Sequence, residues 1–406
     1  MIPDSETNPP SLLVAKGSFE AMGGAERDLI RVLPALNRLF EVTMATIQPS
    51  EELESVCTSE GIRLISPETK WELPNDPLST IMDTGSRTAS KAWASCLGLQ
   101  EAMSNSFALH LVSGDGSLPI LEHITDGLRI HLHLLEPHRG LYEDTLHRLV
   151  DGSPRRNISL TSTMLSIARK RDQSLISSLT SREGVVVSGN SSFSALRARE
   201  VYGIEAGVLW PCIDADEFPE DSSGDAENPY SERSGEYVVS IGRASWAKGT
   251  WETISMLRGT GIALAHVGGG DEKSLEMLRT HADSSEVDTW FAPRLTSPEL
   301  VSLMRNARAI VSLAHNESFG LSPIEAFAVG TPALFVNEGG FRDTIVDDEN
   351  GRLLERGDTE SWHAALGQAA NPATRSEWSE RGRNRIEEMD LTPDAHARRL
   401  WELLHN

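Results

Sequence analysis

Short runs of consecutive apolar residues alternate along the chain with longer segments whose apolar residues recur every three or four positions. The short runs predict strands that are buried on both faces, and the longer segments predict amphipathic helices. In the first half, the predicted strands are residues 11–16, 41–47, 62–65, 107–112, 128–134, 184–188 and 207–209. The predicted helices are one that includes residues 29–36, then 50–60, one within 77–103, 157–179 and 193–201.

The alternation restarts after residues 211–234, where Pro, Gly, Ser, Asp and Glu dominate and the periodicity stops. We interpret this segment as a linker between two domains. The second half has predicted strands at residues 236–241, 262–267, 287–291 and 310–314, and predicted helices from Trp251, at 298–304, from Ser322, and at 361–370, 375–389 and 395–404. Strands separated by helix-length segments predict βαβ units, so we expect an α/β protein with parallel sheets.

Length and charge limit the number of domains and the classes of binding partner. At 406 residues the chain is long for one hydrophobic core, which favours two domains. The net charge of −23 argues against nonspecific binding to nucleic acid and against a strongly electrostatic attachment to membranes, because both need basic surface. No stretch approaches the ~20 consecutive apolar residues of a membrane-spanning helix, so we expect no transmembrane segment.

The cysteines and the N-terminus bear on the cellular compartment. Cys57, Cys96 and Cys212 are far apart and match no metal or redox spacing. Residues 1–10 are acidic and lack the basic and apolar regions of a secretory signal. Both features predict a reducing cytoplasm, with peripheral contact at the inner face of a membrane left open.

Residues 309–335 carry the clearest chemistry in the chain. An apolar strand is followed by a loop and then by Ser322 and Pro323, residue types that begin helices. The backbone N–H groups of residues 319–321 therefore lie at a helix N-terminus, which favours an anion such as phosphate. Glu317 and Glu325 flank the same space and are suited to accept hydrogen bonds from the sugar hydroxyls attached to a phosphate. The alternative is that both glutamates are merely solvated.

Three further turns follow predicted strands and contain glycine. Gly23 and Gly24 would let the backbone approach a ligand, although the three-glycine dinucleotide fingerprint is absent and a simple β-α turn is the alternative. The segment 242–249 contains Arg243 and Lys248. The planar guanidinium of an arginine and the compact ammonium group of a lysine together suit the binding of a diphosphate. Residues 268–270 form a third glycine turn at the end of the next predicted strand.

Other polar clusters give weaker signals. His131, His133 and His138 lack the spacing of a metal site, and contact of one histidine with a substrate is more plausible, against the alternative of core or loop histidines. Asp214-Ala215-Asp216 lies in the acidic linker, where a metal site is not expected. The basic cluster at residues 169–171 is typical of a solvated helix face.

Taken together and in this order, these motifs resemble those of a retaining glycosyltransferase of the large family 4 group, which has the GT-B fold. Glu317 and Glu325, with seven residues between them, match that family's paired-glutamate signature. The other matching segments are Phe319-Gly320, Gly330-Thr331-Pro332, Gly242-Arg243, Lys248-Gly249, Gly268 to Gly270 and Gly23-Gly24-Ala25-Glu26. The resemblance covers nearly the whole chain and is strongest over residues 237–354.

The resemblance implies two Rossmann-like domains with parallel sheets facing across a cleft. Residues 1–205 would form the acceptor domain and residues 206–390 the nucleotide-sugar donor domain, with a C-terminal helix at about 391–406 packing back on the first. Arg243 and Lys248 would hold the diphosphate and stabilise the leaving group. Glu317 would accept from the sugar and Glu325 from the ribose. The other implied donor-binding residues are Gly23, Gly24, Gly242, Gly268, Gly269, Ser318, Phe319, Gly320 and Leu321.

In enzymes of this kind the leaving phosphate is thought to assist deprotonation of the acceptor, and neither a metal nor another cofactor is needed. Two departures from the family pattern matter. Alignment on Arg139 places Leu135 where the family often has a histidine, so His133 or His138 would substitute, and His133 is our candidate catalytic residue. Residues 341–343 read Phe-Arg-Asp where proline and glutamate are frequent, so the transferred sugar stays open.

The predicted reaction is transfer of a sugar to a glycan or a lipid-linked acceptor, as in the synthesis of polysaccharides, glycolipids or glycoprotein glycans. Similar N-terminal loops occur in enzymes that use GDP-mannose, and a UDP-sugar is the alternative donor. Two other functions compete with transfer: a GT-B-fold epimerase, hydrolase or phosphorylase, and a nonenzymatic nucleotide-sugar binding protein. The complete set of glutamates and cations argues against the nonenzymatic alternative.

Overall fold

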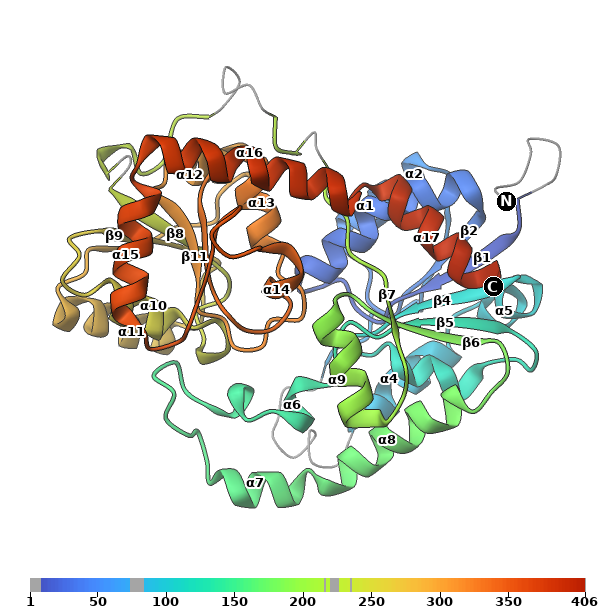
Figure 1. Ribbon diagram of the computed structural model, residues 1–406. Helices are drawn as coiled ribbons and strands as arrows, with labels where there is room; N and C mark the ends of the chain where they lie inside the picture. Colours follow the sequence, from blue (N-terminus) through green and yellow to red (C-terminus); the bar gives the residue numbers. More distant parts are fainter. Residues whose placement is uncertain (1–8, 74–83, 215–216, 220–225, 234–235, 406) are drawn as a thin grey trace. The chain divides into compact units, whose positions relative to one another are not determined.

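A computed structural model describes residues 9–73, 84–214, 217–219, 226–233 and 236–405, and the chain forms two compact units (Figure 1). Unit 1 lies within residues 1–142, 159–213 and 391–406. Unit 2 lies within residues 143–158 and 214–390. The predicted boundary between residues 205 and 206 therefore falls inside unit 1.

Within the described residues, unit 1 is built on a seven-stranded parallel sheet in the order β3-β2-β1-β4-β5-β6-β7. The strands are β1 Ser11–Ala15, β2 Glu41–Ala45, β3 Arg63–Ile65, β4 Ala108–Val112, β5 Arg129–His133, β6 Val185–Gly189 and β7 Gly207–Val208. In the central register, Val14 lies opposite Met44 on one side and His110 on the other. Both faces of this sheet are covered, because one apolar cluster lies on each side of β1.

Among the described residues, the α-helices of unit 1 are α1 Gly24–Leu39, α2 Glu51–Ser59, α4 Thr84–Ala94, α5 Leu99–Asn105, α6 Arg139–Tyr142, α7 Ile158–Met164, α8 Ser166–Thr180, α9 Ser192–Tyr202 and α17 Pro393–His405. Two predicted helices are divided. Gly98, with a φ of +83°, separates α4 from α5, and residues 77–83 of that prediction lie outside the described residues. The predicted helix 157–179 is interrupted at Leu165, which is buried between α7 and α8.

The last helix, α17, packs against α1 within unit 1 (Figure 1). The ring centroids of Phe40 and Trp401 lie 4.9 Å apart, and Leu400 is fully buried in the same apolar cluster. Arg129 Nη1 on β5 donates to the carbonyl oxygen of Leu404 at 2.8 Å and satisfies a carbonyl at the end of the helix. The apolar positions of α17 are thus explained by burial in unit 1.

Unit 2 is built, over its described residues, on a six-stranded parallel sheet in the order β10-β9-β8-β11-β12-β13. The strands are β8 Tyr237–Ile241, β9 Ala263–Val267, β10 Thr289–Phe291, β11 Ala309–Ser312, β12 Ala333–Val336 and β13 Arg352–Leu354. The helices are α10 Thr250–Leu257, α11 Glu272–Ser285, α12 Ser297–Arg305, α13 Ser322–Ala328, α14 Phe341–Thr344, α15 Thr359–Ala369 and α16 Pro372–Met389. The predicted α/β class with two parallel sheets is confirmed.

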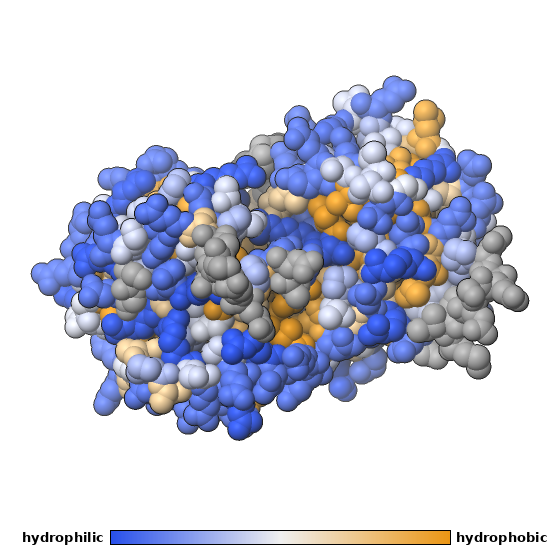
Figure 2. Space-filling view, turned by 90° about the horizontal axis from the view of Figure 1, so that it is seen from above, coloured by the Kyte–Doolittle hydropathy of each residue, from blue (hydrophilic) through white to orange (hydrophobic). Residues whose placement is uncertain are grey.

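The visible surface is mainly polar. The face of the molecule shown in Figure 2 is predominantly hydrophilic, with smaller apolar areas between the polar side chains. In the part of the chain that the structure describes, no helix is both long enough and apolar enough to cross a membrane.

Candidate functional site

In unit 2, the loops that follow β8 and β9 are in direct contact at the carboxyl edge of the sheet. Gly242 donates its N–H to Val267 O at 2.8 Å, and Ala244 donates its N–H to Gly269 O at 2.7 Å. A Cβ atom at Gly268, where φ is +134°, would lie 2.4 Å from Gly242 O. Because no side chain fits in that space, the two predicted glycine turns form one backbone surface.

The loop after β8 also contacts the end of β11. His315 donates its N–H to Ala247 O at 2.9 Å. A Cβ at Gly249, with φ +67°, would lie 2.0 Å from Leu313 O. Glycine at position 249 therefore lets the segment that carries Lys248 lie directly on the strand that leads to Glu317.

The turn after β12 also packs against the loop of residues 315–320. Gly340 donates its N–H to Glu317 O at 2.8 Å, and a Cβ at Gly339 would lie 2.4 Å from the same oxygen. The Phe341 ring fills the space beside Gly320, where an added Cβ would meet it at 2.3 Å. The backbone of Glu317 is thus fixed by close packing.

The structure brings two predicted catalytic residues into contact. Lys248 Nζ lies 2.6 Å from Glu317 Oε2, with side chains 35% and 18% exposed. A pair with this exposure contributes little to stability, about 0–1 kcal/mol. Both groups are therefore able to exchange this contact for one with a ligand. Arg243, next to Gly242, is exposed at the same edge.

The predicted residues 318–325 occupy the loop and the first turns of α13. Phe319 is buried, whereas Ser318, Gly320, Leu321 and Glu325 are partly exposed. The helix begins at Ser322 with Pro323 in its first turn, as predicted, and Leu321 is the N-cap. The helix has only seven residues, so its dipole is short and the attraction for an anion rests mainly on the nearby cations.

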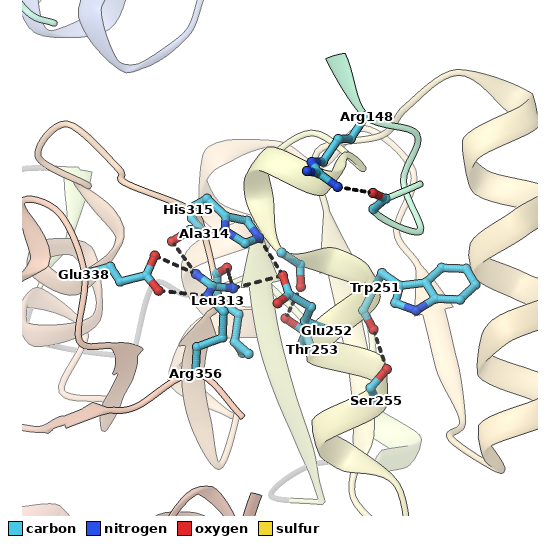
Figure 3. Close-up of polar contacts among 12 residues, drawn as sticks. Arg148, Trp251, Glu252, Thr253, Ser255, Leu313, Ala314, His315, Glu338 and Arg356 are labelled. Atoms are coloured by element: carbon cyan, nitrogen blue, oxygen red, sulfur yellow. Dashed lines mark hydrogen bonds and ion pairs between the residues drawn. The ribbon is translucent and has the colours of Figure 1, made fainter. Parts of the chain in front are cut away.

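A network around Arg356 contacts the residues that follow β11 and was not predicted (Figure 3). The guanidinium donates to Leu313 O at 2.8 Å and Ala314 O at 3.3 Å. It also donates to Glu252 Oε2 at 2.9 Å, and it forms a bidentate pair with Glu338 at 2.8 and 2.9 Å. Arg356 therefore joins α10, the end of β11 and the turn after β12.

The charges in this network stabilise one another. Burial lowers the pKa of Arg356, but hydrogen bonds and charges from Glu338 and Glu252 outweigh that effect and hold it above its usual value. Burial likewise raises the pKa of Glu338, and Arg356 more than offsets it, so the net shift is downward. His315 Nε2 lies 2.8 Å from Glu252 Oε2 and donates to it, since an ionised carboxylate only accepts. Arg356 and Glu338 therefore each favour the charged form of the other.

The other predicted donor-binding residues lie in unit 1. Gly23 is the N-cap of α1, is exposed, and donates its N–H to Glu26 Oε2 at 2.8 Å. Gly24 is the exposed first residue of α1. Glu26 Oε1 also pairs with the buried Lys16 at 2.9 Å. A carboxylate of the protein itself thus occupies a position that an anion would take at this helix N-terminus.

The structure places His133 in the core of unit 1. It is 2% exposed, and its ring lies 6.0 Å from that of His110, with which it stacks, and 6.0 Å from the tilted ring of His131. His396 of α17 lies next to it, with the centroids 6.1 Å apart. A substrate has no access to a ring at this position, so we assign His133 no role in the reaction.

The other histidines and the acidic segment considered as metal ligands do not form a metal site within the described residues. His131 is fully buried, whereas His138 is exposed next to α6. Across the described ranges, no three His, Cys, Asp or Glu side chains are arranged to hold a metal ion. Residues 215 and 216 of the Asp-Ala-Asp segment lie outside the described residues.

The histidine cluster gives unit 1 a testable pH dependence. Burial lowers the pKa of His110, His131 and His133 well below the usual value, and neighbouring histidines lower it further. In the unfolded chain these groups titrate near ~6.5, so below that pH the unfolded state binds more protons and stability falls. For each histidine that stays neutral in the folded state, the free energy of unfolding falls by about 1.4 kcal/mol per pH unit in that range. We expect the thermal midpoint to fall between pH 7 and pH 5.

The double variant His110→Gln/His131→Gln isolates this effect, with the exposed His138→Gln as control. The double variant is expected to reduce the slope of the midpoint against pH, and the control to leave it unchanged. The comparison of slopes is needed because burial raises the pKa of Asp28, and this shift contributes a slope of opposite sign. Equal slopes in all three proteins would show that the histidines are protonated without cost.

The sequence of unit 2 matches a known family. Residues 227–385 match the family model of glycosyl transferases group 1. D-inositol 3-phosphate glycosyltransferase of Corynebacterium urealyticum is 32% identical over 130 residues, 32% of this chain and 28% of that protein. The α-1,3/1,6-mannosyltransferase alg-2 of Neurospora crassa is 29% identical over 123 residues, 30% of this chain and 26% of that protein. The matches thus span less than a third of these curated relatives.

The fold extends the similarity to the whole chain. Sucrose-phosphate synthase of Thermosynechococcus elongatus aligns over 98% of both chains with a TM-score of 0.73 and 16% identity. HepE of Anabaena, in complex with UDP and glucose, aligns over 98% of this chain and 99% of that chain with a TM-score of 0.66 and 14% identity. Residues 227–385 are thus similar to glycosyl transferases group 1, and the chain has the GT-B fold predicted from its motifs.

Proposed function

We propose that this protein is a retaining glycosyltransferase of the family 4 type that moves a sugar from a nucleoside diphosphate to a glycan or a lipid-linked acceptor. The observation that carries the proposal is the contact between Lys248 and Glu317 at the carboxyl edge of the unit 2 sheet. A diphosphate and its sugar need a cation and a hydroxyl acceptor side by side, and this pair supplies both.

The cations and the glycine turns would bind the diphosphate. Lys248 would move from Glu317 to a phosphate oxygen, and the exposed Arg243 would add a second positive charge. The backbone formed by Gly242, Gly268 and Gly269 has no side chains that would keep a phosphate away. As the bond to the sugar breaks, negative charge grows on the leaving phosphate, so both cations stabilise the transition state more than the ground state.

The glutamates would recognise the parts of the donor on either side of the diphosphate. Glu317, released by Lys248, would accept hydrogen bonds from the sugar, and Glu325 in the first turn of α13 would accept from the ribose. The acceptor hydroxyl would attack the sugar from the same face as the one from which the leaving group departs. The leaving phosphate would act as the base that takes the proton from this hydroxyl. In this reaction the protein positions and stabilises charge, and no residue forms a covalent bond to the sugar.

The choice of nucleotide base can be tested first. HepE is recorded with UDP and glucose, and alg-2 is a mannosyltransferase, so UDP-sugars and GDP-mannose are the leading donors to compare. A ligand at ~100 times its Kd stabilises the folded state by about 2.7 kcal/mol. We expect one of UDP, GDP or ADP, or its sugars, to raise the thermal midpoint clearly above the others. Equal midpoints with all of them would contradict the proposed donor site.

Product analysis separates transfer from the alternative reactions. With the preferred donor, a transferase forms a new glycoside only when an acceptor is present. An epimerase changes the sugar without an acceptor, and a hydrolase releases free sugar. Binding without turnover across a broad acceptor panel would favour a nonenzymatic role.

A further inference from the structure

A segment from the middle of the unit 1 sequence belongs to unit 2. The chain leaves unit 1 after Tyr142, at the end of α6, and re-enters it at Ser159, within α7. We call residues 143–158 the crossing segment. Because both of its ends continue into helices of unit 1, it is a covalent connection between the units in addition to the crossings near residues 213 and 390.

The crossing segment contains a turn that is held by its own hydrogen bonds. Arg148 and Pro154 form an antiparallel bridge, and Leu149 donates its N–H to Ser153 O at 2.8 Å. The guanidinium of Arg148 is directed back at the turn and donates to Gly152 O at 2.7 Å (Figure 3). These bonds hold Gly152 in a defined position.

Gly152 lies directly against the indole ring of Trp246. A Cβ atom at position 152 would lie 2.7 Å from Cζ3 of that ring and 2.8 Å from Cη2. The φ of Gly152 is +82°, a left-handed value that glycine adopts without strain. Residues 145–147 of the crossing segment contact the same turn of unit 2, residues 246–248. The crossing segment therefore packs closely on the loop that follows β8.

Trp246 begins the turn that carries the proposed diphosphate cation. The turn Trp246–Lys248 ends at the lysine that contacts Glu317. Gly249 donates its N–H to Trp246 O at 2.8 Å and closes the turn. The Trp246 ring also packs against His315, with ring centroids 4.9 Å apart. A displacement of the Trp246 ring would therefore move the backbone that carries Lys248.

The crossing segment also lies near the glycine turn that follows β9. Asp271 comes directly after Gly268 to Gly270, and it caps α11 by accepting from Ser274 N at 3.0 Å. Hydrogen bonds from Ser274 lower the pKa of Asp271, and the positive charge of Arg155 lowers it further. Arg155 is itself tied to the segment, because its Nε donates to Arg148 O at 2.8 Å. The segment thus approaches both loops of the backbone surface described above.

We infer that the crossing segment positions Lys248 for the diphosphate through the contact between Gly152 and Trp246. Neither of these two residues would touch the donor. In the proposed reaction the Lys248 ammonium moves from Glu317 to a phosphate oxygen, so the backbone of the turn has to stay in place while the side chain moves. The inference rests on the proposed function, in which Lys248 binds the diphosphate.

Calorimetric titration with whichever of UDP, GDP and ADP the wild type binds best tests the inference. Gly152→Ala places a Cβ against the Trp246 ring and is expected to weaken binding about fivefold, a usual size of coupling between residues in contact. Trp246→Leu, which removes the ring and leaves the segment unchanged, is expected to have a similar effect. The thermal midpoint of each variant shows whether it is folded.

Gly259→Ala is the matched control. Gly259 lies in unit 2 with a φ of +78°, and nothing lies within 4 Å of an added Cβ. It therefore carries the same backbone strain as Gly152→Ala without contact with another residue. Its affinity for the nucleotide should equal that of the wild type.

The same titration in the Lys248→Ala background shows where the effect arises. Without the lysine, Gly152→Ala is expected to cause no further loss of affinity. An equal loss in both backgrounds would overturn the inference, because the segment would then act on another group. Wild-type affinity of both Gly152→Ala and Trp246→Leu would also overturn it, while weaker binding by Lys248→Ala would leave the proposed donor site intact. Absence of binding to the wild type would contradict the donor site itself, and the inference with it.

Discussion

Replacing Lys248 with alanine is expected to lower sugar transfer by at least about a hundredfold, because a charge-stabilising group at the leaving phosphate is lost. The thermal midpoint is expected to change little, since the partly exposed pair with Glu317 contributes only about 0–1 kcal/mol. The measurement is donor turnover at saturating acceptor, with the midpoint recorded on the same sample. This combination distinguishes a functional role from a structural one.

Lys273→Ala is the matched control, because Lys273 is an exposed lysine of α11 in the same unit. It removes the same charge from unit 2 without altering the loop after β8, so transfer should remain at the wild-type level. If Lys248→Ala kept more than about a tenth of the activity, the electrostatic role proposed for this lysine would be wrong.

Replacing Arg356 with methionine is expected to lower both stability and turnover. The change leaves the carboxylates of Glu252 and Glu338 and two carbonyl oxygens without their shared donor, at a cost of about 2–3 kcal/mol. The end of β11 would then be held less firmly, and a shift of about 1 Å in the loop that carries Glu317 costs up to about a hundredfold in rate. Denaturant unfolding gives the first quantity, and kcat under saturating donor gives the second.

Arg352→Met provides the comparison for Arg356. Both side chains are 21% exposed, but Arg352 bonds to Asp347 and Gln368 instead of to the end of β11. Its loss should leave kcat unchanged. Arg356→Lys should restore little, because a single ammonium group cannot reproduce the planar, bidentate contacts. Equal kcat values for Arg356→Met and Arg352→Met would contradict a positioning role for Arg356.

Local patterns were sufficient to predict most of the unit 2 site. The strand before Glu317, the start of α13 at Ser322 and the glycine turns are all encoded within a few residues, and the structure has them at the predicted places. Parallel strands bring their carboxyl ends to one edge, which explains why Lys248 and Glu317, 69 residues apart, meet. The fold followed from the same motifs and is confirmed, and residues 227–385 match the family model of glycosyl transferases group 1.

The Arg356 network could not be predicted in the same way. Its partners Glu252 and Glu338 lie 104 and 18 residues away, and each reads in the sequence as an ordinary surface charge. Only the packing of α10, the end of β11 and the turn after β12 shows that one guanidinium bonds to all three. The nearest signal in the sequence is a charged residue two positions after the end of a strand, as at Glu338 and Arg356, which many exposed positions share.

His133 illustrates a different limit. Alternation of apolar and polar residues along a strand distinguishes buried from exposed side chains only when one face of the sheet is in contact with water. Because both faces of the unit 1 sheet are covered, His131 and His133 of β5 are both buried. The sequence therefore identified a polar strand end without revealing that it belongs to the core.

The central claim is that the carboxyl edge of the unit 2 sheet binds a nucleoside diphosphate through Lys248. Calorimetric titration of the full chain with UDP, GDP and ADP tests it most directly. We predict that one of them binds the wild type with a Kd of about 1 mM or lower, the usual upper range for enzyme substrates, and binds Lys248→Ala at least about tenfold more weakly. Absence of binding to the folded wild type, or equal affinity for the two proteins, would contradict the claim.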